Sequence, residues 1–183
     1  AKQIEKYDVE YLEEPCLYYD LEALANVVAK STVPIGAGEH AHTVHGFRDL
    51  IRARAADIFN PDVTVAGGIR ETKNICTIAD AWGIPVIPHC GGLSAIGLAA
   101  NLHLCASAIN CIKLEYDTKP WQPMRDELIT EPIFSLDQVK EGRIKVPTKP
   151  GLGIEINEDA FARYPYIKQD LEPDLPNYGV GRL

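Results

Sequence analysis

The sequence has no long hydrophobic run, no excess of basic residues and no paired cysteine motif, and each absence excludes a class of protein. No apolar stretch approaches the ~20 residues that a membrane-spanning helix needs, so we expect no membrane segment. Lys and Arg number 18 against 26 Asp and Glu, and the net charge of −8 argues against a nucleic-acid partner. Five cysteines without a C-x-x-C pair predict reduced thiols in a cytoplasmic protein.

The chain does contain a repeated alternation of apolar, strand-like runs and helical patterns. We predict strands over residues 9–14, 33–39, 56–62, 84–89 and 110–116. We predict helices between them over residues 20–31, 44–55, 67–83 and 93–107. Apolar strands separated by helices are typical of parallel βαβ units, whose sheet is covered on both faces.

Each predicted strand ends in a charged or imidazole side chain. The strand ends carry Glu13, Glu39, Asp62, His89 and Glu115. In a (β/α)8 barrel the active site lies at the carboxyl ends of the strands. The predicted fold is therefore α/β, a partial (β/α)8 barrel of about five βα units within residues 1–117.

After residue 117 the alternation stops. The sequence becomes punctuated by Pro and Gly, with only short strand or helix pieces. We predict that residues 118–183 form an irregular C-terminal tail, which packs on the barrel or on another domain. A complete barrel has eight strands in ~250 residues, so about three units would have to come from elsewhere.

Glu13 and Glu39 end neighbouring strands, so their carboxylates are expected to reach one divalent cation. Oxygen ligands favour a hard cation such as Mg²⁺, and two carboxylates leave positions for water and substrate. Taken alone, Glu13 has a simpler interpretation as a surface strand end before Pro15.

Asp62 and His89 end the next two strands. A carboxylate that accepts a proton from one imidazole nitrogen fixes the tautomer and raises the basicity of the other nitrogen, as acid–base catalysis requires. Singly, Asp62 fits a turn residue and His89 fits a buried core histidine. Cys90 lacks an activating neighbour in the sequence and is not expected to be a nucleophile.

Five segments in order carry a resemblance: YLEEP, GAGEH, NPDVTVAGGI, GIPVIPHCGG and KLEYD. Together they resemble the C-terminal barrel part of enolase-superfamily enzymes of the mandelate racemase and muconate lactonizing enzyme family. Muconate-cycloisomerase-like members carry lysine at the position of Asp62, and glucarate-dehydratase-like members carry asparagine at the position of Glu39. The mandelate racemase subgroup fits both positions, and GEH and EYDTKPW are more similar to its sugar-acid dehydratases.

The resemblance implies roles for individual residues. It implies Glu13 and Glu39 as Mg²⁺ ligands, Asp62 and His89 as the acid–base dyad, and Glu115 as a hydrogen-bond partner of the substrate carboxylate. His40 has two open roles, a substrate contact or a structural one.

The resemblance also implies parts that residues 1–183 lack. These are a third metal ligand, a lysine pair on an early barrel strand and an N-terminal capping domain. We therefore expect the early barrel strands and the capping domain as partners, a homo-oligomer, and no activity from residues 1–183 alone.

The function that we predict is a Mg²⁺-dependent dehydratase of a small sugar acid, such as a galactonate-like aldonate. It would remove the proton α to the carboxylate and eliminate the β-hydroxyl as water. Two alternatives stay open: a racemase or epimerase of the same superfamily, and a truncated barrel that binds without turnover.

Overall fold

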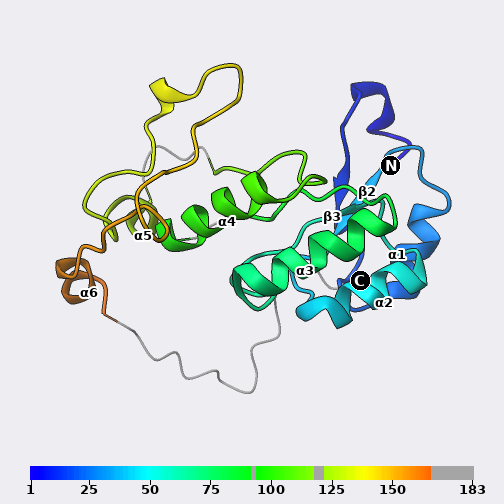
Figure 1. The fold of residues 1–183 in the computed structure, drawn as a ribbon. Helices are drawn as coiled ribbons and strands as arrows, with labels where there is room; N and C mark the ends of the chain where they lie inside the picture. Colours follow the sequence, from blue (N-terminus) through cyan, green and yellow to red (C-terminus); the bar gives the residue numbers. More distant parts are fainter. Residues whose placement is uncertain (92–93, 118–121, 166–183) are drawn as a thin grey trace.

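The computed structural model describes residues 1–91, 94–117 and 122–165. Its sheet contains β1 (Leu12–Glu13), β2 (Ile35–Ala37) and β3 (Ile58–Phe59), which pair in parallel in the order β1-β2-β3. Single parallel bridges, Phe59 to Val86 and Val86 to Cys111, extend the sheet by two more segments. Five parallel neighbours in chain order confirm the predicted partial barrel (Figure 1).

The predicted strands over 84–89 and 110–116 are wrong in length, because each pairs at one residue only. Pro85 and Pro88 flank Val86 and have no backbone N–H to donate to a neighbouring strand. The three earlier strands are also shorter than predicted. Proline before Ile35 and after Asn60 limits two of them in the same way.

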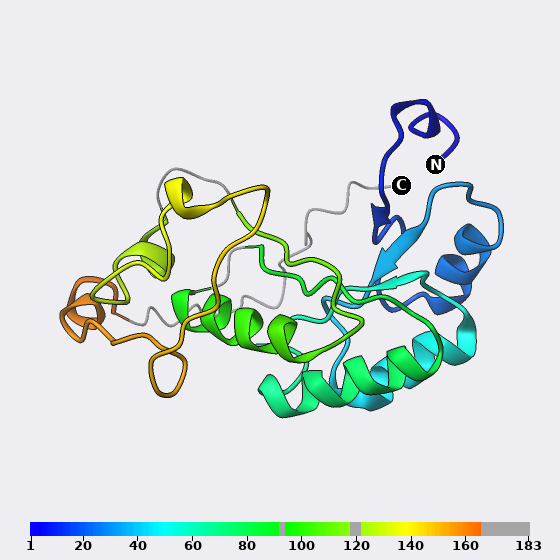
Figure 2. The ribbon, with the colours of Figure 1, turned by 45° about the horizontal axis from the view of Figure 1, so that its top comes forward.

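Four helices alternate with these segments, as the sequence predicts. They are α1 (Leu21–Val28), α2 (Thr43–Ala53), α3 (Gly68–Ala81) and α4 (Ala95–Ser107). Asp20 caps α1 by accepting a hydrogen bond from the Ala23 N–H, and Ser94 caps α4 through the Gly97 N–H. Leu93, the predicted first residue of the fourth helix, lies outside the described residues. Figure 2 shows α1, α2 and α3 along one side of the sheet.

The core lies between the sheet and these helices. The rings of Phe47 on α2 and Phe59 on β3 meet edge to face with centroids 5.1 Å apart, and both side chains are fully buried. Ile75 of α3 and Leu104 of α4 belong to the same buried cluster. This packing fixes the strands from their outer side, so their carboxyl ends are held as one rim.

The described part of the tail, residues 122–165, contains short elements only. These are α5 (Pro123–Asp126), the 3-10 turn η2 (Leu136–Gln138) and α6 (Asp159–Arg163). Another 3-10 turn, η1 (Glu5–Tyr7), lies near the N-terminus. Both views place residues 122–165 beside α4 and away from β1 (Figures 1 and 2). The predicted boundary between 117 and 118 stays a prediction, and residues 166–183 of the predicted tail lie outside the described residues. Within the described part of the chain, no helix is both long and apolar enough to cross a membrane.

Candidate active site

Asp62 and His89 form a direct pair at the carboxyl ends of adjacent parallel segments. The Nδ1 atom of His89 lies 2.9 Å from Oδ2 of Asp62, whose side chain is almost fully buried. The other oxygen of Asp62 accepts hydrogen bonds from the backbone N–H and the hydroxyl of Thr64, at 2.7 and 2.6 Å. The carboxylate is therefore held on both sides and holds the imidazole in turn.

The contact shifts the pKa values of the two groups in opposite directions. The hydrogen bond to Asp62 raises the pKa of His89 to about 9, although burial opposes the shift, and Glu39 and Glu115 add to it. Burial raises the pKa of Asp62, but the hydrogen bonds from His89 and Thr64 outweigh burial and leave that pKa below its usual range. The structure thus favours an ionised Asp62 beside a protonated His89.

The second nitrogen of His89 faces two carboxylates. Nε2 lies 3.4 Å from Oε2 of Glu39 and 4.0 Å from Oε2 of Glu115. Glu115 also accepts a hydrogen bond of 2.8 Å from the backbone N–H of Cys90, which fixes its carboxylate beside the ring. One imidazole therefore joins the strand ends that carry Asp62, Glu39 and Glu115.

Glu13 lies on β1 at the same rim. Its Oε1 atom is buried and has no hydrogen-bond partner among the described residues. Burial raises the pKa of Glu13, and the nearby Glu115 and Glu39 raise it further. A buried, unpaired carboxylate oxygen among other carboxylates fits a cation, because a cation would offset both the desolvation and the repulsion.

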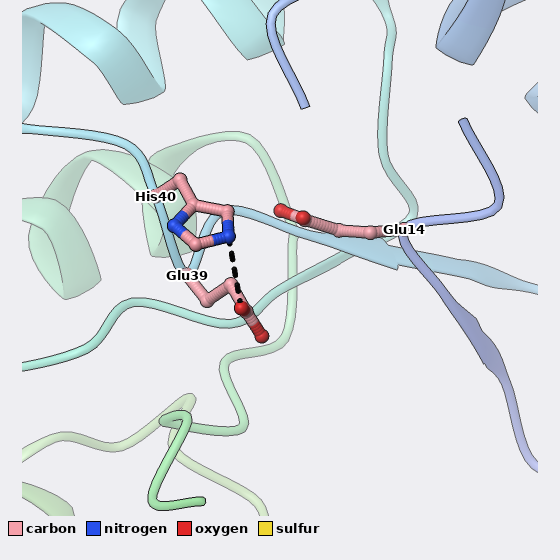
Figure 3. A group of neighbouring side chains, drawn as sticks. All are labelled: Glu14, Glu39 and His40. Carbon is pink, nitrogen blue, oxygen red and sulfur yellow. Dashed lines mark ion pairs between the residues drawn. The ribbon is translucent and has the colours of Figure 1, made fainter. Parts of the chain in front are cut away.

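Glu14 also reaches this rim; it follows Glu13 at the end of the predicted strand but was not predicted as a metal ligand. Figure 3 shows Glu14 pointing from the end of β1 toward Glu39 and His40. The ligand atoms of these three residues lie within 4.8 Å of one another. Glu14 has a left-handed backbone, with φ of 36°, and accepts a hydrogen bond from the Gly38 N–H. This turn breaks the alternation of side chains between the two faces of a strand. The adjacent Glu13–Glu14 pair was therefore the one feature of the sequence that indicated a second carboxylate here.

His40 lies at the outer part of the rim. Its Nε2 atom pairs with Glu39 at 3.1 Å, and its ring lies 4.5 Å from that of Tyr18 between centroids. The side chain is about half exposed. Both roles that the sequence leaves open, a contact to substrate and a structural one, are compatible with this position.

Cys90 is buried next to His89, and burial raises the pKa of its thiol to about 12. A thiol that keeps its proton is a poor nucleophile, which agrees with the expectation from the sequence. The reactive groups of the rim are therefore carboxylates and the imidazoles of His89 and His40, which suit cation binding and proton transfer.

Comparison with known proteins places this geometry in a family. Residues 1–160 match the family model described as enolase C-terminal domain-like. The D-xylonate dehydratase of Haloferax volcanii is 34% identical over 163 residues, covering 87% of this chain and 37% of that protein. The arabinonate dehydratase of Saccharolobus solfataricus is 35% identical over 166 residues, covering 90% of this chain and 42% of that protein.

A solved structure shows the same fold. The 3,6-anhydro-D-galactonate cycloisomerase from Zobellia galactanivorans superposes with a TM-score of 0.80 at 31% identity, covering 90% of this chain and 45% of that one. The chain spans about two-fifths of the length of the curated relatives that it matches.

Proposed function

This chain belongs to the enolase C-terminal domain-like family, and on that premise we propose that its rim works in the dehydration of a sugar acid. The reaction removes the proton α to the substrate carboxylate and expels the β-hydroxyl as water. The observation that carries the proposal is the Asp62–His89 pair, whose second ring nitrogen, Nε2, faces the carboxylates of Glu39 and Glu115. Two relatives named as sugar-acid dehydratases support the substrate class.

Glu13 and Glu39 would hold a Mg²⁺ ion in this proposal. The unpaired Oε1 of Glu13 and the raised pKa of that carboxyl group support this choice. When bound, the ion supplies positive charge that stabilises the negative charge developing on the substrate carboxylate. Glu14 and His40 lie close enough to adjust the position of Glu39.

His89 would act as the general acid. Its pKa of about 9 keeps a proton available near neutral pH, and Asp62 holds the Nδ1 side so that Nε2 is the nitrogen that transfers it. As the α-proton leaves to a base outside the described residues, the C–O bond at the β-carbon breaks. The proton from Nε2 completes the departing water, and the resulting enol becomes a 2-keto-3-deoxy acid.

Glu115 and His40 are the proposed substrate contacts. Glu115 is held by the Cys90 N–H and is more than one-third exposed, so one face of its carboxyl group is open to a ligand. His40 is about half exposed at the outer rim, where it can donate to a sugar hydroxyl.

We propose that catalysis needs strands beyond the five segments described. The sheet has β1 at one edge and the Cys111 segment at the other, and a closed barrel has no edges. Early barrel strands with a capping domain would close the sheet and enclose the substrate. A homo-oligomer is a further proposal of the same kind.

A second reaction is favoured by one finding, the similarity to a solved cycloisomerase. If Nε2 of His89 delivers its proton to the α-carbon, the same residues give a racemase or an epimerase. These outcomes conserve the mass of the substrate, whereas dehydration lowers it by one water. A barrel that binds a sugar acid without turnover is the remaining alternative.

The test is a screen of aldonic acids with Mg²⁺, using the complete protein to which residues 1–183 belong. We expect at least one acid to yield a 2-keto-3-deoxy product, detected as a new keto acid and by mass. The matched control is the His89→Asn variant, which should bind Mg²⁺ but give no product. Isomerisation without a keto acid would favour the racemase or cycloisomerase alternative, and binding without any product would contradict the enzyme proposal.

A further inference from the structure

The peptide between His89 and Cys90 is held by side chains from both sides. Asn101, on α4, donates from Nδ2 to the carbonyl oxygen of His89 at 3.0 Å. Glu115 accepts from the backbone N–H of Cys90 at 2.8 Å. These two bonds fix the backbone immediately beneath the imidazole.

The sheet itself supplies little support at this point. Val86 makes the parallel bridges of this segment, and Pro88 has no N–H with which to continue them. The His89 N–H reaches the Pro61 carbonyl at 3.2 Å, at the long end of the normal range. Without Asn101, the carbonyl of His89 would lose its described partner.

Asn101 is also unusual for its helix. The buried side of α4 is otherwise apolar or glycine, whereas Asn101 is fully buried and polar. Its Oδ1 atom has no hydrogen-bond partner among the described residues. Burying Oδ1 unpaired costs about 1–3 kcal/mol, and leucine is the better helix former, so what asparagine offers at this position is its bond to the His89 carbonyl.

We propose that Asn101 is a positioning residue for His89. By holding the carbonyl of His89, it sets where the ring lies between Asp62 on one side and Glu39 on the other. In this proposal Asn101 acts through the backbone carbonyl of His89 and not by contact with substrate or cation, and its amide also lies against the Cys90 thiol. The inference rests on the proposed role of His89, but the geometry that it concerns exists without substrate.

The chain offers a matched control in Asn110. Its Nδ2 atom donates to the carbonyl oxygens of Cys76 and Ile84, at 3.0 and 3.1 Å, and so anchors the beginning of the segment that His89 ends. Asn110→Leu removes the same kind of bond from the same segment, away from the rim. Asn101→Leu fills the space of the amide without a donor. Asn101→Ser is a milder second variant, whose shorter side chain does not reach the carbonyl.

The experiment is NMR of the ¹⁵N-histidine-labelled chain without metal or substrate, following the Nδ1–H proton that His89 shares with Asp62. The signal is assigned by its absence in His89→Asn. We expect it to be lost or exchange-broadened in Asn101→Leu and Asn101→Ser and retained in Asn110→Leu. In the active protein, the Asn101 variants should lower kcat by up to about 100-fold with little change in KM.

Two results would overturn the inference. One is an unchanged Nδ1–H signal in the Asn101 variants, and the other is equal loss of that signal in Asn110→Leu. Failure of the proposed function is distinct from both, because it would appear as absence of turnover in the wild-type protein while the spectra still report the position of His89.

Discussion

The region of parallel segments and the tail differ in what they offer a ligand. Residues 9–117 bring Glu13, Glu39, Asp62, His89 and Glu115 to one rim, with an imidazole at its centre. The tail has a cavity of about 890 Å³, lined by residues between Thr130 and Glu155. None of the predicted site residues lines that cavity, and no histidine does.

The difference teaches that the tail cavity lies apart from the predicted site residues, whereas the outer rim has a smaller hollow of about 220 Å³, lined in part by Glu14. The rim has coupled titratable groups at the open ends of the strands, while the tail cavity lies open between loops. The tail bridge that pairs Ile129 with Ile156 is antiparallel, so it does not continue the barrel. We therefore propose the rim as the place of the reaction.

The largest effect should come from the central imidazole. His89→Asn should lower turnover of the best sugar acid by about 10²–10⁴-fold, because it removes the general acid. Asp62→Asn should impair the same step, so the double variant should be little worse than the worse single one. Steady-state kinetics on the complete protein provide the measurement.

The control for this prediction is His103→Asn. His103 lies on α4, and its Nε2 atom contacts the Leu152 carbonyl of the tail at 3.1 Å, so the change removes an imidazole from the contact between α4 and the tail, away from the rim. Near-normal turnover is expected. If His103→Asn were as damaging as His89→Asn, the division between rim and tail would be wrong.

Stability should separate the two regions next. Phe47→Ala leaves a cavity at a fully buried site against Phe59 and should lower the free energy of unfolding by about 3–5 kcal/mol. Phe161→Ala, in α6, removes a ring that is more than half exposed and should change the free energy of unfolding by no more than about 0.5 kcal/mol. Urea unfolding of both variants gives the comparison, and equal losses would contradict the placement of the main buried cluster in the parallel region.

Cation binding should distinguish neighbours within the rim. Glu13→Gln and Glu39→Gln should each weaken Mg²⁺ binding by at least about tenfold. Mutation of a residue that only orients a metal ligand already weakens metal affinity by about that factor. Glu14→Gln should have a smaller effect, because the Gly38 N–H already partners this carboxylate. Calorimetric titration of the three variants is the check. A larger loss with Glu14 than with Glu13 would reverse the assignment.

The fold and most of the rim could be predicted from the sequence. Both follow from the hydrophobic periodicity of the segments and from the order of strands and helices along the chain. Alternating apolar runs and helices predict parallel segments, and parallel segments place Glu39, Asp62 and His89 at one edge. The match of residues 1–160 to the family model confirms the resemblance on which the enolase-superfamily assignment was based.

The parts that were not predicted depend on local backbone geometry. Strand lengths were overestimated because the prolines at 85 and 88 interrupt pairing within an apolar run. Glu14 joins the rim through a left-handed backbone, which a non-glycine residue seldom adopts and which strand alternation does not predict. Asn101 reaches His89 from α4, twelve residues away, and its helical position gives no sign of that contact.

The last effect that we predict is the contribution of His89 to the pH dependence of stability. The hydrogen bond to Asp62, with Glu39 and Glu115, raises the pKa of His89 to about 9 in the folded chain. Because the unfolded value is about 6.5, the folded state binds this proton more tightly. The contribution is therefore complete below about pH 6.5 and is lost as the pH rises through about 9. Urea midpoints measured with a chelator at about pH 6 and about pH 9.5 should fall more in the wild-type chain than in His89→Asn, whereas His103→Asn should follow the wild type. An identical fall in all three proteins would show that other groups carry the dependence and that His89 does not hold its proton as the geometry of the rim requires.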